Sequence, residues 1–562
     1  MPKSKFIFVT GGVISGLGKG ITCASLARLV QEHGYKVSVA KADMYLNLDA
    51  GTMNPLEHGE VFVTEDGMET DQDVGHYERF INQDLSRNSY FTLGQIYYDV
   101  ISKERRLEYD GKCVEGHIHI PEEIIGRILN SVKDTDTEVT FIEVGGTVGE
   151  YQNIMFYEAI RRFKQRYPNN VFLVHLVYLI VPGFLGEMKS KPAQSSIYEL
   201  YKLGLQPNFV VCRGDTEVDE KRKTTISFNT GVKYDHIISA PDVDTIYEIP
   251  LVLKRQKMDV LILEEMGLKP KSKTDTSWEI MVKNTKKAKD VLSIAIAGKY
   301  FTSGNFCLED SYVCVIEAIK HACWKSKIKP EIHWFDVEKL ENPKTKAEIE
   351  KQLIVADGII VPQGWGKRGV EGKLEAVRIA RENKIPYLGL CFGMQMAVIE
   401  YARNVLKLRD ANSEEVDPNT KNKVIHIMEL QKEFLTKQEY GGTIRLGAYP
   451  CKIKPGTLLE DAYKKNGAHR INKGTVMERH RHRYEFNNQY RQMLEDKGLV
   501  ISGTSPDNML VESIELPVNT HPFFVGTQFH PEYKSRPLDP HPIFCEFINV
   551  SKKIKIKNET TI

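Results

Sequence analysis

Residues 6–20 read Phe-Ile-Phe-Val-Thr-Gly-Gly-Val-Ile-Ser-Gly-Leu-Gly-Lys-Gly, an apolar run that ends in a glycine-rich turn. The apolar part is typical of a buried strand, and the turn lets backbone N–H groups approach phosphate oxygens at a following helix N-terminus. Gly12 to Gly18 spans one residue more than the standard phosphate-binding loop, and Gly20 replaces its usual Ser or Thr. We predict a nucleotide-binding strand–turn–helix with Lys19 against the phosphates; the alternative is a glycine-rich turn without a ligand.

Outward from this stretch, short β-rich apolar runs alternate with longer helical patterns. This alternation predicts largely parallel sheets with helical crossovers, whose ligands lie at the carboxyl ends of the strands. The lysine-rich stretch 271–290 is the predicted linker, with a short helix around Trp278 and Ile280. The expected domains are a nucleotide-binding unit, a second α/β unit and a flexible tail, at residues 1–270, 291–550 and 551–562. The expected strands lie at residues 6–10, 36–40, 140–144, 172–180, 209–212, 291–297, 358–362, 387–390 and 523–529.

Bulk composition excludes several classes of protein. A chain of 562 residues is too long for a single hydrophobic core, so we predict two or three domains. The 76 Lys and Arg residues nearly balance the 75 Asp and Glu residues, which argues against nucleic-acid binding driven by the overall charge of the protein. Nine cysteines without CxxC pairs predict neither a zinc site nor a disulfide framework. The most apolar stretch, 171–181, is shorter than the roughly 20 residues of a membrane span. With an N-terminus unlike a signal peptide, we expect a soluble cytoplasmic protein without membrane or nucleic-acid partners.

Carboxylates near the glycine-rich turn predict a magnesium site. Glu143 ends an apolar run just before a Gly-Gly pair, where a Walker-B-like acid belongs. Glu69, Asp71 and Asp73 alternate, so an extended chain would place them on one face; the alternative is a solvated acidic strand. We predict Asp73 and Glu143 as the Mg²⁺ ligands. Cationic side chains suited to a second polyphosphate are Lys41, Lys189 and Lys191.

A second site is predicted around a cysteine. Residues 389–393 read Gly-Leu-Cys-Phe-Gly and form a cysteine version of the nucleophile elbow, in which a helix N-terminus favours the thiolate of Cys391. Downstream, His530 supplies a base and Glu532 a carboxylate to orient it. These residues predict covalent acyl transfer; the alternative is a buried structural cysteine.

Groups that would bind the substrate of this cysteine are also present. Backbone donors for the oxyanion are expected at Phe392 and in the Gly364-Trp365-Gly366 turn. The basic stretch 479–483 contains three arginines and two histidines, and Arg483 is suited to bind a substrate carboxylate.

Taken together, these motifs resemble the CTP synthase family, glutamine-dependent amidoligases that convert UTP to CTP. The resemblance runs over residues 4–548. The resembling segments are 9–20, 59–67 (Gly-Glu-Val-Phe-Val-Thr-Glu-Asp-Gly), 76–80 (His-Tyr-Glu-Arg-Phe), 143–149, 441–447 (Gly-Gly-Thr-Ile-Arg-Leu-Gly) and 479–485. It implies a P-loop-type parallel-sheet synthetase domain followed by a class I glutamine amidotransferase α/β domain.

The resemblance also implies the chemistry. ATP would phosphorylate O4 of UTP, Cys391 would release ammonia from L-glutamine through a glutamyl thioester, and ammonia would cross a tunnel to displace the phosphate. It further implies Mg²⁺ as cofactor, ATP as co-substrate, activation by GTP, inhibition by CTP, homotetramers and filaments.

Site residues carried over by the resemblance fall into four sets. The ATP set is Gly16, Leu17, Gly18, Lys19, Gly20, Ile21, Asp73 and Asp242. The UTP and CTP set is Ser15, Lys41, Glu150, Lys189, Lys191 and Gln194. The glutamine set is Gly364, Phe392, Gly393, Met394, Gln395, Glu415 and Arg483. The tunnel set is Pro55, His58 and Val61.

Several positions depart from the family pattern. The segment 114–119 reads Val-Glu-Gly-His-Ile-His in place of Val-Gln-Val-Ile-Pro-His, and Thr225 stands where a lysine is expected. Gln363 replaces a glycine of Pro-Gly-Gly-Phe-Gly, and its side chain is expected to limit the backbone movement that forms the oxyanion hole. Two alternatives to an active enzyme of this family stay open: a filament-forming or regulatory paralogue with weak turnover, and a P-loop amidoligase with another substrate.

Overall fold

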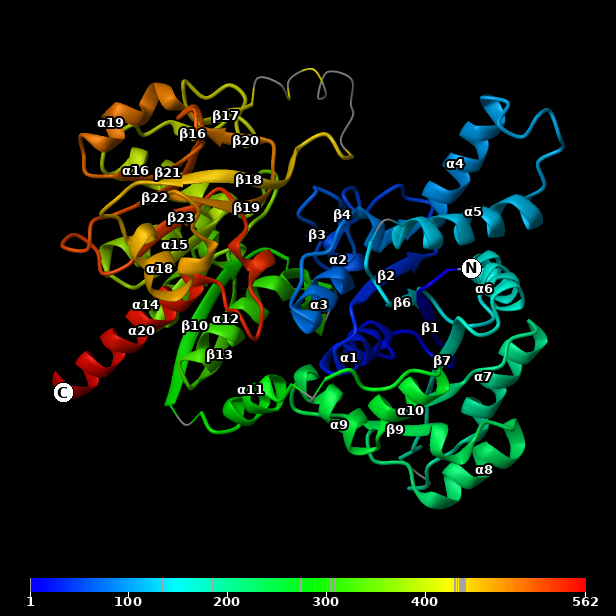
Figure 1. Ribbon diagram of the computed structural model, residues 1–562. Helices are drawn as coiled ribbons and strands as arrows, with labels where there is room; N and C mark the ends of the chain where they lie inside the picture. The colour runs from blue at the N-terminus through cyan, green and yellow to red at the C-terminus, as the bar shows by residue number, and fades with distance from the viewer. Residues whose placement is uncertain are drawn as a thin grey trace. The chain divides into compact units, whose positions relative to one another are not determined.

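The computed structural model describes residues 2–561 except 134, 184–185, 273–274, 289, 301, 304–305, 308, 429–430, 432 and 434–440. The chain divides into two compact units (Figure 1). The first unit contains residues 1–50 and 73–282, and the second contains residues 51–72 and 283–562.

The first unit is built on a sheet of seven parallel strands in the order β5-β2-β6-β1-β7-β8-β9. Its central strands are continuous apolar runs because helices cover both faces, and β6 is buried along its whole length. The strands are β1 (Lys5–Gly11), β2 (Val37–Asp43), β5 (Tyr90–Thr92), β6 (Val139–Val144), β7 (Val171–Tyr178), β8 (Phe209–Gly214) and β9 (Ile237–Pro241). The main helices are α1 (Lys19–Glu32), α3 (Gln72–Ile81), α4 (Leu93–Arg105), α5 (Gly116–Ser131), α6 (Ile154–Arg166), α7 (Lys191–Lys202), α8 (Glu220–Thr230), α9 (Ile249–Arg255) and α10 (Met258–Glu265).

Aromatic and aliphatic packing fixes these layers. Phe6 and Phe8 of β1 lie 5.0 and 6.2 Å, between ring centroids, from Phe163 of α6. The predicted linker contains a helix, α11 (Ser277–Thr285), as expected. Its Trp278 is fully buried and donates from Nε1 to the carbonyl of Tyr247 at 2.9 Å, so this part of the linker packs into the first unit.

The second unit contains a nine-stranded mixed sheet in the order β13-β10-β14-β15-β23-β22-β21-β18-β19. Strands β13 to β23 in this order are parallel, and the remaining neighbours are antiparallel. The strands are β10 (Asp290–Gly298), β13 (Ile328–Asp336), β14 (Gly358–Val361), β15 (Tyr387–Leu390), β18 (Arg445–Ile453), β19 (Thr475–His482), β21 (Val500–Thr504), β22 (Val511–Glu515) and β23 (Phe524–Thr527). The main helices are α12 (Val313–Lys325), α14 (Lys346–Ile354), α15 (Val370–Glu382), α16 (Phe392–Asn404), α18 (Leu458–Asn466) and α20 (Pro542–Thr561). The two-sheet α/β fold class is confirmed, and every strand expected from the sequence overlaps a strand of the structure.

Two segments differ from the expected organisation. Residues 51–72, expected in the first domain, group with the second unit, where they form α2 (Pro55–His58) and the short strands β3 (Phe62–Val63) and β4 (Glu69–Thr70). The expected flexible tail is instead the continuation of α20, whose Lys555 donates to the carbonyl of Val291 at 3.0 Å and to Asp357 at 3.1 Å.

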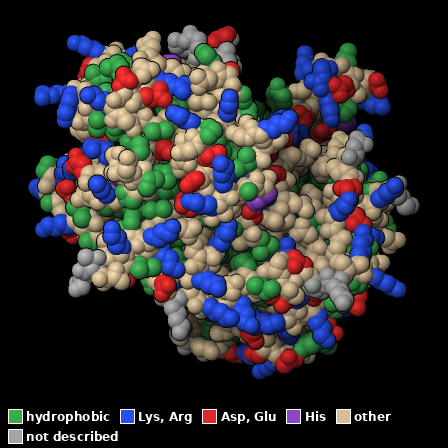
Figure 2. Space-filling model, turned by 60° about the vertical axis from the view of Figure 1, so that its left-hand side comes forward, with side chains coloured by type: hydrophobic (Ala, Val, Ile, Leu, Met, Phe, Trp, Pro, Cys, Tyr) green, Lys and Arg blue, Asp and Glu red, His purple; other side chains and the backbone are tan. Residues whose placement is uncertain are grey.

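Surface charge is mixed. On the face shown in Figure 2, Lys and Arg side chains are interspersed with Asp and Glu side chains, in line with the net charge of +1. Among the described residues, no helix combines the length and apolar character that crossing a membrane requires.

Candidate functional sites

The glycine-rich turn after β1 adopts a strained backbone. Gly16 and Gly18 have φ of 72° and 78°, and Val13 has φ of 81°, which is unfavourable for a β-branched residue. Helix α1 starts at Lys19, whose Nζ donates to the carbonyl of Gly146 at 2.8 Å. Strain of this kind persists where the surroundings enforce it and is common at ligand sites. The predicted phosphate-binding turn is therefore a strand–turn–helix that presents the N-terminus of α1.

The two predicted metal ligands lie together beside this turn. A Cβ added at Gly20 would lie 2.3 Å from Asp73 Oδ1 and 3.1 Å from Glu143 Oε2, so both carboxylates approach the same point. This explains the absence of the usual Ser or Thr, because Asp73 fills the space of that side chain. Lys41 donates to Asp73 Oδ2 at 2.6 Å, and the Tyr77 hydroxyl donates to Glu143. Burial, together with the charge of Asp73, raises the pKa of Glu143 to about 7.

The expectation that Glu69, Asp71 and Asp73 share one face is wrong. The chain leaves the extended conformation after β4 and begins α3 at Gln72, so Asp73 lies in a helical turn. Within the second unit, Glu69 accepts from Arg481 Nε at 2.8 Å and Asp71 lies 3.4 Å from His58. Of the three carboxylates, Asp73 is the one that lies beside Gly20 and Glu143 within the first unit.

Residues expected to contact UTP or CTP follow the carboxyl ends of neighbouring strands. Ser15 follows β1, Lys41 lies near the end of β2 and Glu150 follows β6. Glu150 already accepts from the backbone and hydroxyl of Thr147, at 2.8 and 2.6 Å, which fixes its local turn.

The remaining predicted nucleotide contacts lie farther along the same edge of the sheet. Lys189 pairs with Glu187 at 2.7 Å, Lys191 begins α7, and Gln194 accepts from Asn229 at 2.9 Å. Asp242, after β9, accepts from Arg213 at 2.7 Å. The parallel sheet thus brings the sets to one edge, as the general rule for such sheets predicts.

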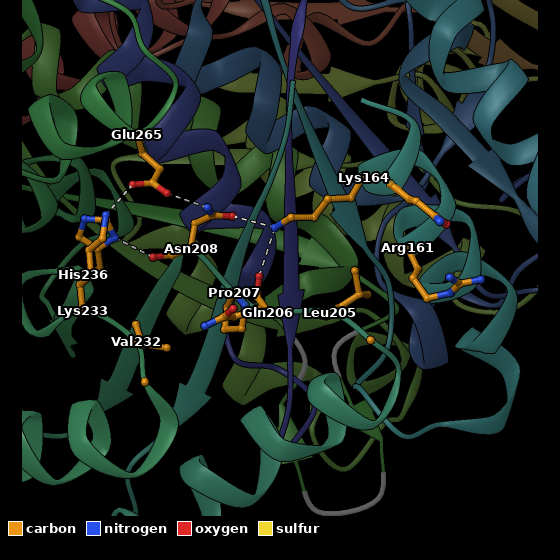
Figure 3. A pocket seen from close by; sticks show the side chains of 13 residues that line it. Arg161, Lys164, Leu205, Gln206, Pro207, Asn208, Val232, Lys233, His236 and Glu265 are labelled. Atoms are coloured by element: carbon orange, nitrogen blue, oxygen red, sulfur yellow. Dashed lines mark hydrogen bonds and ion pairs between the residues drawn. The ribbon is translucent and has the colours of Figure 1, made fainter. Parts of the chain in front are cut away.

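A pocket of about 570 Å³ lies at the opposite, amino ends of β8 and β9 (Figure 3). It is lined by Lys164, Asn208 and Glu265, among others, and no residue of the predicted sets is among those that line it. Helices α6, α7 and α8 end near it, and helix C-termini present carbonyl oxygens that disfavour anions. We therefore do not assign it to a nucleotide.

The predicted nucleophile elbow is present in the second unit. Cys391 follows β15, precedes α16 and has φ 50° and ψ −99°, a conformation rare for a residue with a side chain. A Cβ at Gly393 would lie 1.9 Å from the carbonyl oxygen of Val361, and one at Gly389 would lie 2.8 Å from the backbone of Gly393. The two glycines are therefore required by the close approach of α16 to the strands.

His530 follows β23, the strand next to β15, and pairs with Glu532. Nδ1 of His530 lies 2.7 Å from Glu532 Oε1, and the side chains are 1% and 0% exposed. Nε2 has no nitrogen or oxygen partner among the described residues, and the ring lines the same pocket as Cys391. Burial lowers the pKa of His530, but the charges of Glu532 and Cys391 outweigh it and raise the pKa to about 10.

The pocket at Cys391 is small and adjoins a larger one. Its volume is about 10 Å³, against about 310 Å³ for the neighbour, and Trp365, Glu415, Arg481, Arg483 and Tyr484 line both. Of the predicted glutamine set, five residues line the small pocket, namely Gly364, Phe392, Gln395, Glu415 and Arg483. The other two do not: Met394 packs into the apolar core, and Gly393 faces Val361.

Two groups near the thiol were missed by the sequence analysis. Gln528 donates from Nε2 to Cys391 Sγ at 3.5 Å and accepts from Gln395 at 3.2 Å. Lys373, fully buried, donates to the carbonyls of Pro362 at 2.6 Å and Gln363 at 3.2 Å. Gln528 lies two residues before His530, so its position in the sequence could have indicated a role at the thiol. Nothing in the sequence around Lys373 indicates that it lies there.

Most of the predicted basic stretch 479–483 lies in β19, where successive side chains point to opposite faces of the sheet, so the histidines and the arginines are separated. His480 and His482 are buried together, and burial holds their pKa values well below the ordinary value, so they are uncharged. Arg479 and Arg481 pair with Glu65 and Glu69 of the 51–72 segment, both ion pairs within the second unit.

The predicted tunnel residues lie in that segment. Pro55 begins α2, His58 ends it, and the carbonyl of Val61 accepts from the Tyr533 hydroxyl at 3.0 Å. The Tyr533 ring stacks on His530 with a centroid distance of 4.8 Å.

Two family models match separate stretches of the chain. Residues 5–268 match the family model of the CTP synthase N-terminus, and residues 307–550 match that of class-I glutamine amidotransferase. The CTP synthase of Caldanaerobacter subterraneus subsp. tengcongensis is 48% identical over 99% of this chain and 99% of its own length. That of Carboxydothermus hydrogenoformans is 48% identical over 98% of this chain and 99% of its own length. Among solved structures, the glutaminase domain of Trypanosoma brucei CTPS with bound acivicin is 36% identical, with a TM-score of 0.41, and the match covers 47% of this chain and 94% of that chain.

Proposed function

The chain belongs to the CTP synthase family, and from this premise we propose that it aminates UTP to CTP with ammonia released from L-glutamine at Cys391. The observation that carries the proposal is the presence of both required sites in one chain. The strained turn before Lys19 is suited to ATP, and the elbow at Cys391, with its buried His530–Glu532 pair, is suited to amide hydrolysis.

At the second site, Cys391 Sγ attacks the carboxamide carbon of glutamine. His530 donates a proton from Nε2 to the departing ammonia, while Glu532 accepts from Nδ1–H and keeps the ring oriented. The oxyanion accepts from the backbone N–H groups of Phe392 and Gly364. Water then cleaves the thioester and releases glutamate.

The substrate's own charges select the side chains that hold it. Arg483 lines both pockets and suits the α-carboxylate, and Glu415 suits the α-ammonium. We place the entry route in the larger pocket, of about 310 Å³, because the small one of about 10 Å³ cannot hold a whole amino acid.

At the first site, ATP binds with its phosphates on residues 16–21, and Asp242 lies on the adenosine side. Lys19 neutralises phosphate charge at the N-terminus of α1. O4 of UTP attacks the γ-phosphorus of ATP, ADP leaves, and ammonia then displaces phosphate from C4 to give CTP. The proposed contacts to UTP and CTP lie near the carboxyl end of β2 (Lys41) and after β1, β6 and β7 (Ser15, Glu150, Lys189, Lys191 and Gln194).

The residues beside Gly20 fit a magnesium ion. Asp73 and Glu143 offer hard oxygen donors that approach one point beside Gly20. Asp73 and Glu143 would hold Mg²⁺, which when bound offsets the charge of the transferred phosphoryl group. Lys41, which pairs with Asp73, would contact a phosphate when Asp73 holds the ion.

Regulation and assembly belong to the same proposal. Ammonia passes Pro55, His58 and Val61, GTP activates glutamine hydrolysis, and CTP inhibits at the UTP site. We also propose a homotetramer, with filaments as a higher assembly. Tyr98, Ile101 and Leu107, at and after α4, are each at least 60% exposed, which supports an apolar contact face on the first unit.

Product formation tests this function directly. Purified protein with UTP, ATP, Mg²⁺ and L-glutamine should form CTP, followed by the absorbance change and identified by chromatography. If CTP forms with neither glutamine nor ammonia, the proposal is wrong, and a protein that polymerises without turnover would point to the regulatory paralogue.

A further inference from the structure

The segment 51–72 makes hydrogen bonds and ion pairs with residues near Cys391. Within the second unit, the carbonyl of Val61 accepts from Tyr533, the residue next to Glu532 in the chain, at 3.0 Å. Glu69 pairs with Arg481, which lines the pocket at the thiol. The segment therefore contacts both the residue next to Glu532 and a residue that lines the pocket at the thiol.

One further contact reaches the turn that supplies the oxyanion donor, residues 362–366. Gln363 donates from Nε2 to Glu60 Oε1 at 2.5 Å, and Glu60 Oε2 accepts from the backbone N–H of Cys314 at 2.7 Å. The carboxylate is thus fixed by the start of α12 on one oxygen and holds Gln363 with the other. A hydrogen bond to a charged acceptor is stronger than one between neutral groups.

The backbone of the same turn is held by two buried lysines. Lys373 donates to the carbonyl of Gln363, and Lys299 donates to the carbonyls of Trp365, Gly366 and Arg368. In a trans peptide the carbonyl and the following N–H point in opposite directions. The Gly364 N–H is therefore directed away from Lys373. Its direction would change if Gln363 lost its contact with Glu60 and the peptide between residues 363 and 364 rotated.

The segment that contains Glu60 is covalently joined at both ends to the nucleotide-binding unit. The segment 51–72 leaves the nucleotide unit at Ala50 and returns to it at Asp73, the proposed ATP and metal residue. Resting on the proposed function, we propose that Gln363 is a positioning residue that couples the oxyanion turn to nucleotide occupancy through Glu60. A change at Asp73 on nucleotide binding is passed along the segment to Glu60 and, through Gln363, to the Gly364 peptide.

A charge-swap pair tests this coupling. Glutamate release is measured with and without saturating ATP, UTP and Mg²⁺, and the ratio of the two kcat/KM values is the readout. Gln363→Glu places two carboxylates together and breaks the contact, so the ratio should move toward one by about fivefold or more, as typical couplings do. In the double variant Gln363→Glu with Glu60→Gln, residue 60 becomes the donor and residue 363 the acceptor, so the hydrogen bond is restored and the ratio should return to the wild-type value. Gln492→Glu is the matched control, because Gln492 also donates to a carboxylate, that of Asp496, on the surface of α19.

The outcomes separate the coupling from the proposed function. CTP formation with ammonia does not use the oxyanion turn, so its failure in the wild type overturns the proposed function. If ammonia supports synthesis but the ratio is near one in the wild type, is unchanged in Gln363→Glu, or is not restored in the double variant, the coupling is wrong. A merely structural role of Gln363 would lower both kcat/KM values together and leave their ratio unchanged.

Discussion

Replacing Glu532 by Gln removes the charge that keeps His530 protonated while preserving the size of the side chain. Both side chains are almost fully buried and their polar atoms lie 2.7 Å apart. In the wild type the pKa of His530 is about 10, because the charges of Glu532 and Cys391 overcome burial. Without the carboxylate, one of the two charges that overcome burial is lost, and the pKa of His530 falls.

The lower pKa of His530 determines how much kcat for glutamine hydrolysis falls. A lower pKa leaves less of the ring protonated at a given pH, so His530 less often carries the extra proton that it would give to the departing ammonia. The amide can also turn and donate to Nδ1, which places the proton of the neutral ring on Nε2, so that Nε2 cannot accept a proton from the thiol or from the attacking water. We expect kcat for glutamine hydrolysis to fall by roughly 10² to 10⁴, the usual contribution of general acid–base catalysis.

The assay is glutamate release at pH 6 to 10, with CTP formation from ammonia in the same preparation as internal reference. Glu546→Gln is the control, since Glu546 is also buried and paired, with Lys465, away from the thiol. A Glu532→Gln protein that hydrolyses glutamine within about threefold of the wild type would refute the assigned role of Glu532.

The same pKa shift predicts how stability depends on pH. The folded-state pKa of His530 lies above the unfolded value, so its stabilising contribution is fully present below pH 6.5 and is lost as the pH rises through about 10. Glu532→Gln should therefore lower the unfolding midpoint of the second unit most near pH 6, and the difference should narrow toward pH 10.

Three further substitutions probe the two sites. Gly20→Ala places a methyl group 2.3 Å from Asp73 Oδ1, so it should raise the Mg²⁺ concentration needed for ammonia-dependent synthesis, and an unchanged Mg²⁺ titration would argue against this metal position. Gly393→Ala would clash with the carbonyl of Val361 at 1.9 Å and should destabilise the second unit by about 1 to 3 kcal/mol in denaturant unfolding; no loss would mean that α16 can shift. Lys19→Ala should abolish synthesis from both glutamine and ammonia, and activity with either would remove Lys19 from the phosphate site.

Local sequence patterns predicted much of both sites because their geometry is set by neighbouring residues. The turn at Cys391 is confirmed because a strand, two glycines and a helix within seven residues leave few other conformations. The same holds for the phosphate-binding turn before Lys19. The parallel strands that precede these turns then bring them to the carboxyl edges of the two sheets.

Contacts between distant segments could not be predicted in this way. The alternation of Glu69, Asp71 and Asp73 suggested one face, but the chain turns helical at Gln72, and tertiary partners decide where each carboxylate points. The contact between Gln363 and Glu60 joins residues about three hundred positions apart and has no local signature. The resemblance implies that Met394 binds glutamine, whereas helical geometry turns its side chain into the core.

The central claim is that Cys391 supplies ammonia to a separate site that makes CTP. The most direct test is CTP formation by Cys391→Ala, measured with UTP, ATP and Mg²⁺ and with glutamine or ammonia as the nitrogen source. The account predicts no CTP from glutamine and wild-type-like formation from ammonia, because the thiol acts only on glutamine. CTP formation from glutamine, or loss of both activities in a protein that folds normally, would contradict it.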